Sequence, residues 1–67
     1  MYNSRFNGEK LRELRKQNGL TREQLAEAFY VTTLTIHNWE NNLKIPHFDT
    51  IVEIADFFGV SLDEFVK

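Results

Sequence analysis

The chain has 67 residues, 42% of them hydrophobic and none a cysteine, so we expect one small domain over residues 1–67 without disulfides or a cysteine-rich zinc site. No apolar run approaches the roughly 18 residues that span a bilayer, and no signal peptide follows Met1, which indicates a cytoplasmic protein without a membrane partner. The net charge is −2, but residues 1–24 hold six cations and three anions, whereas residues 49–67 hold one cation and five anions. This asymmetry is a weak indication that the basic end faces a polyanion.

The first predicted helix covers about residues 8–18. Leu11 and Leu14 lie on one face of it, and charged side chains occupy much of the rest. Gly19 ends this helix, because glycine readily adopts the left-handed conformation that closes a helix. The second predicted helix covers about residues 21–29 and opens with the Thr-x-x-Gln pattern of a capping box. Its apolar face consists of Leu25, Ala26 and Phe29.

Residues 31–36 allow two interpretations. Their β-branched side chains favour a strand by propensity. A helix over about residues 32–41, capped by Thr32, instead places Ile36 and Trp39 on one buried face. A lone strand would have nothing to pair with, so we prefer the helix.

Two further helices are predicted after a loop that contains Pro46, which blocks helix continuation. The fourth covers about residues 48–58 and ends at Gly59. The fifth is short, covers about residues 61–66, and opens with a second capping box. The apolar residues of the fourth helix recur at helical spacing: Ile51, Ile54, Ala55 and Phe58.

Several short motifs occur in a fixed order and at fixed spacings along the chain. They are Leu11-Arg12-Glu13-Leu14-Arg15, Gly19-Leu20-Thr21, Gln24-Leu25-Ala26-Glu27, Val31-Thr32, Ile36-His37-Asn38-Trp39-Glu40, Pro46 and Ala55-Asp56-Phe57-Phe58-Gly59-Val60-Ser61-Leu62-Asp63-Glu64. This set, over roughly 55 of the 67 residues, resembles the Cro and phage-repressor (Xre-like) helix-turn-helix family. The resemblance implies a compact all-α domain of the lambda-repressor type, with five helices and the helix-turn-helix at the second and third. It further implies a transcriptional repressor that binds a double-stranded, inverted-repeat operator as a homodimer, without a metal or other cofactor.

The resemblance assigns base reading to four side chains of the third helix, which are Thr33, Leu34, His37 and Asn38. Their chemistry suits this role. Asn38 can bond adenine through two hydrogen bonds, Thr33 and Leu34 can contact a thymine methyl, and His37 can donate to guanine or to a phosphate. A solvated helix face remains the alternative, since polar residues opposite a core stripe need no further reason.

The residues expected at DNA phosphates are Thr21, Arg22, Thr32, Asn42 and Lys44. Arg22 stands at the start of the second helix, where the family usually has glutamine, and adds a positive charge to its hydrogen bonds. For the two threonines, helix capping alone is a sufficient explanation. For Lys44, a phosphate contact and an ordinary solvated lysine remain equally open.

Glu40 occupies the last turn of the third helix, where an acid opposes the helix dipole and needs a cationic partner. In the family, the position that matches Arg15 supplies this partner. The resemblance therefore implies a structural ion pair between Arg15 and Glu40 that holds the third helix.

Three features depart from the pattern or exceed what one small core needs. Tyr30 stands where most relatives have glycine, so a left-handed backbone there would be strained by about 1 kcal/mol. Residues 23–43 hold no lysine or arginine, which predicts weak non-specific DNA binding and a shallow salt dependence. The surplus of aromatic and apolar residues near the C-terminus suggests a homodimer surface formed by Phe57, Phe65 and Val66.

An enzyme is not expected, because the two histidines form no metal-binding spacing and the three glycines form no phosphate-binding loop. The serious alternative is a protein-interaction role on the same fold, as a co-repressor, an antirepressor or an antitoxin-like partner. The chain is expected to be a complete short protein rather than the DNA-binding part of a longer regulator, although its end after the final predicted helix suits both.

Overall fold

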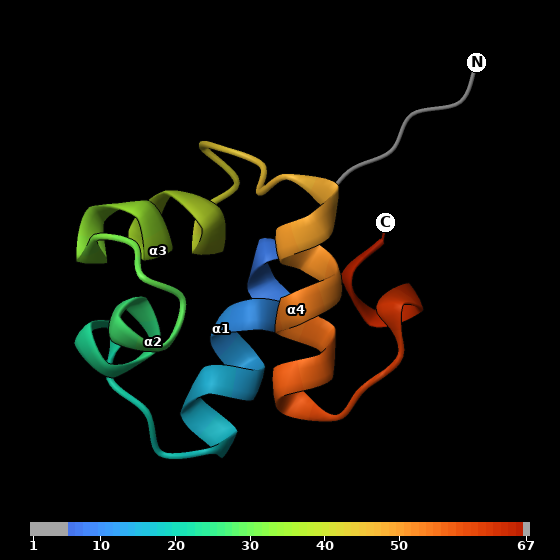
Figure 1. Ribbon diagram of the computed structural model, residues 1–67, viewed down its shortest axis with the longest axis horizontal. Helices are drawn as coiled ribbons and strands as arrows, with labels where there is room; N and C mark the ends of the chain where they lie inside the picture. The colour runs from blue at the N-terminus through green and yellow to red at the C-terminus, as the bar shows by residue number, and fades with distance from the viewer. Residues whose placement is uncertain (1–5, 67) are drawn as a thin grey trace.

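The computed structural model describes residues 6–66, which form four α-helices followed by one short 3-10 helix (Figure 1). Arg5 and Lys67, which contribute to the charge asymmetry, lie outside the described residues. The elements are α1 (Gly8–Gln17), α2 (Arg22–Ala28), α3 (Thr33–Glu40), α4 (Phe48–Phe58) and η1 (Leu62–Phe65). No helix in the described part of the chain is long and apolar enough to cross a membrane.

The predicted start signals act as helix caps. The Thr21 side chain accepts from the backbone N–H of Gln24 at 3.1 Å, and the Gln24 side chain accepts from the Thr21 N–H at 2.9 Å, which completes the capping box of α2. Thr32 caps α3 with its hydroxyl alone, which accepts from the N–H of Thr35 at 3.1 Å. The helical interpretation of residues 31–36 is therefore confirmed, and among residues 6–66 the only β pairing is an isolated bridge between Phe6 and Val66.

The prediction of a fifth α-helix over residues 61–66 is wrong. This segment is a 3-10 helix of four residues, in which the N–H of Glu64 donates to the Ser61 carbonyl at 3.0 Å and the N–H of Val66 to the Asp63 carbonyl at 3.2 Å. Val66 is already extended and forms the bridge to Phe6. The bridge ends the segment at Val66 after only four helical residues, and runs this short commonly adopt the tighter 3-10 form.

The core draws on every helix and on the segment before α1. The side chains of Phe6 and Phe65 stack with their ring centroids 5.6 Å apart, so that the start and the end of the described chain meet. Trp39 is buried, as its spacing with Ile36 predicts. The buried apolar residues are Phe6, Leu11, Leu14, Leu25, Ala26, Ile36, Trp39, Ile54, Ala55 and Phe65.

Helix α1 approaches the end of α3 so closely that a side chain at the first residue of α1 would collide with it. A Cβ atom on Gly8 would lie 2.1 Å from the carbonyl oxygen of Trp39. The Gly8 N–H donates to the side-chain oxygen of Asn42 at 3.1 Å, directly after α3. Glycine is thus required at this position by close packing against the backbone of α3.

Lys10 joins α1 to η1. Its Nζ lies 3.1 Å from a carboxylate oxygen of Glu64 and 3.2 Å from one of Glu13. The hydrogen bonds with Glu64 and then with Glu13 raise the pKa of Lys10 above its ordinary 10.5.

Candidate nucleic-acid interface

Helices α2 and α3 are joined by a turn of four residues, 29–32, whose backbone crosses the left-handed region at Tyr30 with φ of 57°. The N–H of Val31 reaches back to a carbonyl in α2 at 3.0 Å, and the N–H of Tyr30 to another at 3.3 Å, which together form a Schellman motif. Gly19 and Gly59 occupy the equivalent left-handed positions after α1 and α4. The strain foreseen for Tyr30 is therefore present, and its side chain is 96% exposed.

Helix α3 lies at the edge of the molecule beside α2 (Figure 1). Ile36 and Trp39 are buried on its inner side, while Thr33, Leu34 and His37 are exposed. Asn38 is half-buried and lines a groove of about 360 Å³ between α3 and α4. The four residues expected to read bases thus lie along one short helix, with three of them open to a partner.

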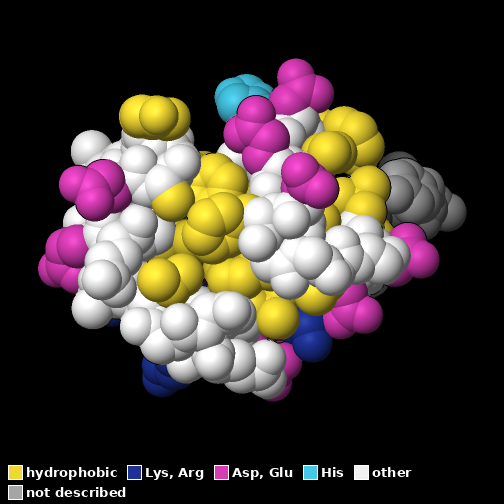
Figure 2. Space-filling model, turned by 60° about the horizontal axis from the view of Figure 1, so that its bottom comes forward, with side chains coloured by type: hydrophobic (Ala, Val, Ile, Leu, Met, Phe, Trp, Pro, Cys, Tyr) yellow, Lys and Arg dark blue, Asp and Glu magenta, His cyan; other side chains and the backbone are white. Residues whose placement is uncertain are grey.

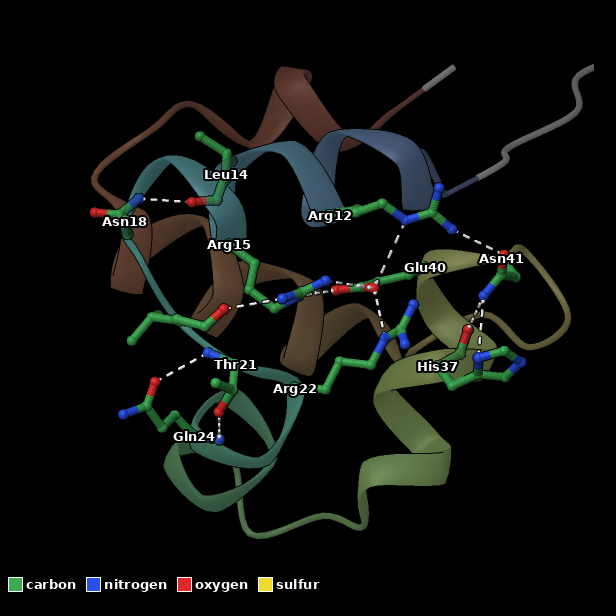
Figure 3. Close-up of polar contacts among 11 residues, drawn as sticks. Arg12, Leu14, Arg15, Asn18, Thr21, Arg22, Gln24, His37, Glu40 and Asn41 are labelled. Atoms are coloured by element: carbon green, nitrogen blue, oxygen red, sulfur yellow. Dashed lines mark hydrogen bonds and ion pairs between the residues drawn. The ribbon is translucent and has the colours of Figure 1, made fainter.

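Glu40 is the centre of a cluster of three arginines (Figure 3). Its side chain is fully buried, and Arg15 donates to both of its carboxylate oxygens, at 2.5 Å through Nε and 3.3 Å through Nη2. Arg22 donates through Nε at 3.0 Å, and the Nε of Arg12 lies 3.8 Å away. The ion pair expected between Arg15 and Glu40 is therefore one part of a larger network that joins α1, α2 and α3.

Arg12 extends this network to the outer side of α3. Its Nη2 donates to the side-chain oxygen of Asn41 at 2.8 Å. The amide nitrogen of Asn41 lies 2.8 Å from the backbone carbonyl of His37 and 3.3 Å from its Nδ1 (Figure 3). The buried carboxylate is thereby linked, through two side chains, to one of the candidate base-reading residues.

The five residues expected at phosphates differ in how they are already engaged. Arg22 is held by Glu40 through Nε, and among residues 6–66 its two terminal nitrogens have no hydrogen-bond partner. The hydroxyls of Thr21 and Thr32 accept the capping bonds, and the oxygen of Asn42 accepts from Gly8. Lys44 is exposed and lines the groove beside α3.

The expected homodimer surface needs a correction. Phe65 has no exposed surface at all, because it stacks on Phe6 inside the core, so it cannot contact a second copy. Phe57 is 49% exposed and packs edge-on against Phe29 and Phe58, and Val66 is 45% exposed. Figure 2 shows apolar side chains gathered across one face of the molecule, with acidic side chains around them.

Comparison with known proteins decides the family. The sequence model described as helix-turn-helix matches residues 11–65. The chain belongs to the helix-turn-helix family. The resemblance to its Cro-like and Xre-like members is thereby confirmed, and the matched residues include α2, α3 and the turn between them.

The chain is similar to two named sequence relatives and to one solved structure. The HTH-type transcriptional activator BcrR of Enterococcus faecalis is 41% identical over 59 residues, which are 88% of this chain and 29% of that protein. The HTH-type transcriptional regulator ImmR of Bacillus subtilis (strain 168) is 29% identical over 56 residues, 84% of this chain and 44% of that protein. The DNA-binding domain of BldD from S. venezulae superposes with a TM-score of 0.75 at 27% identity and covers 90% of both chains.

These relatives are named as transcription regulators rather than as enzymes, in agreement with the sequence. The chain spans less than half the length of both sequence relatives.

The sequence missed three participants in the network around α3, and the spacing of two of them, Arg12 and Asn41, carried a signal. Arg12 lies three residues before Arg15, on the same face of α1, so both side chains point at the end of α3. Asn41 follows His37 by four residues and meets it for the same reason. The engagement of Arg22 by Glu40 had no such signal, because it depends on how α2 packs against α3.

Proposed function

We propose that this domain binds duplex DNA in a sequence-specific manner and regulates transcription, with α3 in the major groove. The observation that carries the proposal is the exposed side of α3, held at its last residue by the buried Glu40 cluster. A reading helix must keep its orientation to within a fraction of an ångström, and a charged network joining three helices supplies that rigidity. Membership of the helix-turn-helix family and the BldD DNA-binding domain as a structural neighbour support the same assignment.

Thr33, Leu34, His37 and Asn38 read the base edges in this proposal. Leu34 is 66% exposed, which is unfavourable for a solvated helix and suits contact with a thymine methyl. Asn38 offers both a donor and an acceptor to adenine.

Arg22 and Lys44 supply the charged phosphate contacts. Arg22 reaches solvent with 37% of its side chain exposed while Nε stays bound to Glu40, so its terminal nitrogens are pre-oriented for a phosphate. Thr21 can still donate its hydroxyl proton while it caps α2, and Thr32 can do so when the hydroxyl of Thr35, 2.9 Å away, donates to it. The amide nitrogen of Asn42 can donate while its oxygen accepts from Gly8.

A homodimer on an inverted repeat completes the proposal, with the two copies of α3 about 34 Å apart. After the exclusion of Phe65, the candidate contact surface is reduced to Phe57 and Val66. We propose a repressor, as the sequence predicts. Because the relative BcrR is named as an activator, the direction of regulation needs its own test, a reporter with the operator placed upstream of the promoter or overlapping it.

Selection of binders from a randomised duplex library at low salt tests the main proposal. Enrichment of an inverted repeat with half-sites one helical turn apart is the expected result. Replacing a base-reading residue, as in Asn38→Ala, should change the preferred bases, whereas Arg22→Gln should weaken binding to all sequences alike. Lys16→Gln, at an exposed position of α1, removes the same charge and is the control for the change of charge. A folded protein that enriches no sequence would refute the proposal.

A protein-interaction role is the second candidate, because several exposed side chains near α3 are apolar. Tyr30, Leu34, Leu43, Ile45 and Phe48 are each more than half exposed. For DNA binding, the logarithm of the association constant falls linearly with the logarithm of the salt concentration, whereas association through an apolar surface responds little to salt. Binding of a partner that is unchanged between low and high salt would therefore favour this second function.

A further inference from the structure

Among residues 6–66, His37 is the one base-reading candidate whose side chain is hydrogen-bonded to another side chain. The contact comes from Asn41, which follows it by one helical turn, and Asn41 is in turn held by Arg12 from α1. Arg12 itself lies against the buried carboxylate of Glu40. A path of polar contacts therefore runs from the interior of the domain to the proposed reading surface (Figure 3).

The chemistry of its neighbours determines the orientation of the Asn41 amide. Arginine can only donate, so the Asn41 atom 2.8 Å from Arg12 Nη2 must be the oxygen. A backbone carbonyl can only accept, so the Asn41 atom 2.8 Å from the His37 carbonyl must be the nitrogen. Both neighbours require the same orientation, and the alternative flip would lose both bonds.

This orientation leaves one proton of the Asn41 amide for the His37 ring. The amide nitrogen lies 3.3 Å from Nδ1, so Nδ1 must offer its lone pair there. In neutral imidazole the proton then resides on Nε2, the nitrogen that points away from Asn41.

We propose that Arg12 and Asn41 are positioning residues that hold His37 in the tautomer protonated at Nε2. On the proposed DNA-binding function, on which this step rests, His37 then presents a hydrogen-bond donor to the major groove. Guanine offers two acceptors there, N7 and O6, whereas cytosine offers only the N4 amino donor. His37 accordingly selects a guanine or another acceptor base and disfavours cytosine.

The tautomer is measured in the free protein, by nitrogen NMR of the imidazole at a pH at which His37 is neutral. The parent should show the proton mainly on Nε2. Asn41→Asp keeps an acceptor for Arg12 but replaces the amide donor by a second acceptor, so the proton should move to Nδ1. Asn42→Asp adds the same charge one residue further on and retains the acceptor for the Gly8 N–H, and should leave the tautomer unchanged.

Identical imidazole spectra for the parent and Asn41→Asp, with both proteins folded, would overturn the proposal. This result is independent of whether the domain binds DNA, so failure of the proposed function is recognised separately.

The second measurement concerns base preference in the DNA site. His37→Ala first identifies the position of the site at which the preferred base depends on His37, and the other variants are then compared at that position. Asn41→Asp should reduce the preference for an acceptor base over cytosine there by about five-fold. Asn42→Asp should weaken binding to all sequences and leave this ratio unchanged. An unchanged ratio in Asn41→Asp, after a tautomer shift seen by NMR, would refute the role in specificity.

Discussion

Replacing Glu40 by glutamine tests whether the buried carboxylate holds the three helices together. The substitution keeps the size and shape of the side chain and removes its charge. Arg15, whose side chain is only 9% exposed, would then be left in the interior without a counter-charge, and Arg22 and Arg12 would lose theirs at the surface. Arg15→Met is the informative comparison, because Glu40 would still keep Arg22 at 3.0 Å.

The expected loss of stability is large for a domain of this size. Removing one partner of a buried ion pair costs about 3–5 kcal/mol, because an unpaired charge remains in the interior. A domain of 67 residues has a total stability of about 3–10 kcal/mol at the usual value per residue. Arg15→Met should cost less, about 1–3 kcal/mol, since the carboxylate retains two arginines. The double variant should cost less than the sum of the two single variants.

Thermal unfolding followed by circular dichroism measures these differences. A change of 1 kcal/mol shifts the midpoint by about 4–8 °C in a domain of this length, so Glu40→Gln should lower it by more than about 12 °C. Glu27→Gln, on the exposed side of α2, is the control and should change stability by less than about 0.5 kcal/mol. Equal losses for Glu40→Gln and Arg15→Met, or additive losses in the double variant, would show that the arginines do not share one carboxylate and that this reasoning is wrong.

Three further substitutions test separate features of the fold. Tyr30→Gly should stabilise the domain by about 0.5–1 kcal/mol, because it relieves a left-handed backbone at a side chain that is 96% exposed; Tyr30→Ala retains Cβ and should give no such gain in urea unfolding. Gly8→Ala should cost about 2–3 kcal/mol, since the new Cβ would lie 2.1 Å from the backbone of α3, and an unchanged urea midpoint would contradict this contact. Lys10→Gln should lose the contribution that the ion pair of Lys10 with Glu64 makes to the stability of the folded protein. Because the pKa of Lys10 is raised in the folded protein, that contribution is fully present below its ordinary value of 10.5 and disappears as the pH rises through the raised pKa, so the two proteins should converge in stability only above pH 10.5.

The elements of the fold follow from local signals that the sequence carries directly. Thr21 and Thr32 predict where α2 and α3 begin, and the apolar spacing of α4 predicts which of its faces is buried; the structure confirms all three. Local signals are weaker where a segment is short. Ser61 and Glu64 match the pattern of a capping box, yet the chain forms only a 3-10 turn, because the bridge between Phe6 and Val66 ends the segment.

The surface assignments depend on contacts between distant residues, which a periodic pattern does not contain. Phe65 is adjacent to the exposed Val66 and gives no local sign of burial, and only the stacking of Phe6 from the other end of the chain explains it. By its charge and its position at the start of α2, Arg22 is expected to be a free phosphate ligand, but the packing of α2 against α3 brings it to Glu40. Such residues are identified only when the relative placement of the helices is known.

The basic character of residues 1–24 has an internal explanation. Arg12, Arg15 and Arg22, half of the six cations in this segment, converge on Glu40. A single buried carboxylate at the C-terminal end of α3 adds to the negative potential of the last carbonyls of that helix, so more than one cation is favoured there. The charge asymmetry of the sequence is thus accounted for in large part by the junction of three helices. It gives little support of its own to a polyanion partner, and the proposal of DNA binding depends on the exposed side of α3 and on the family, not on the net charge of the basic segment.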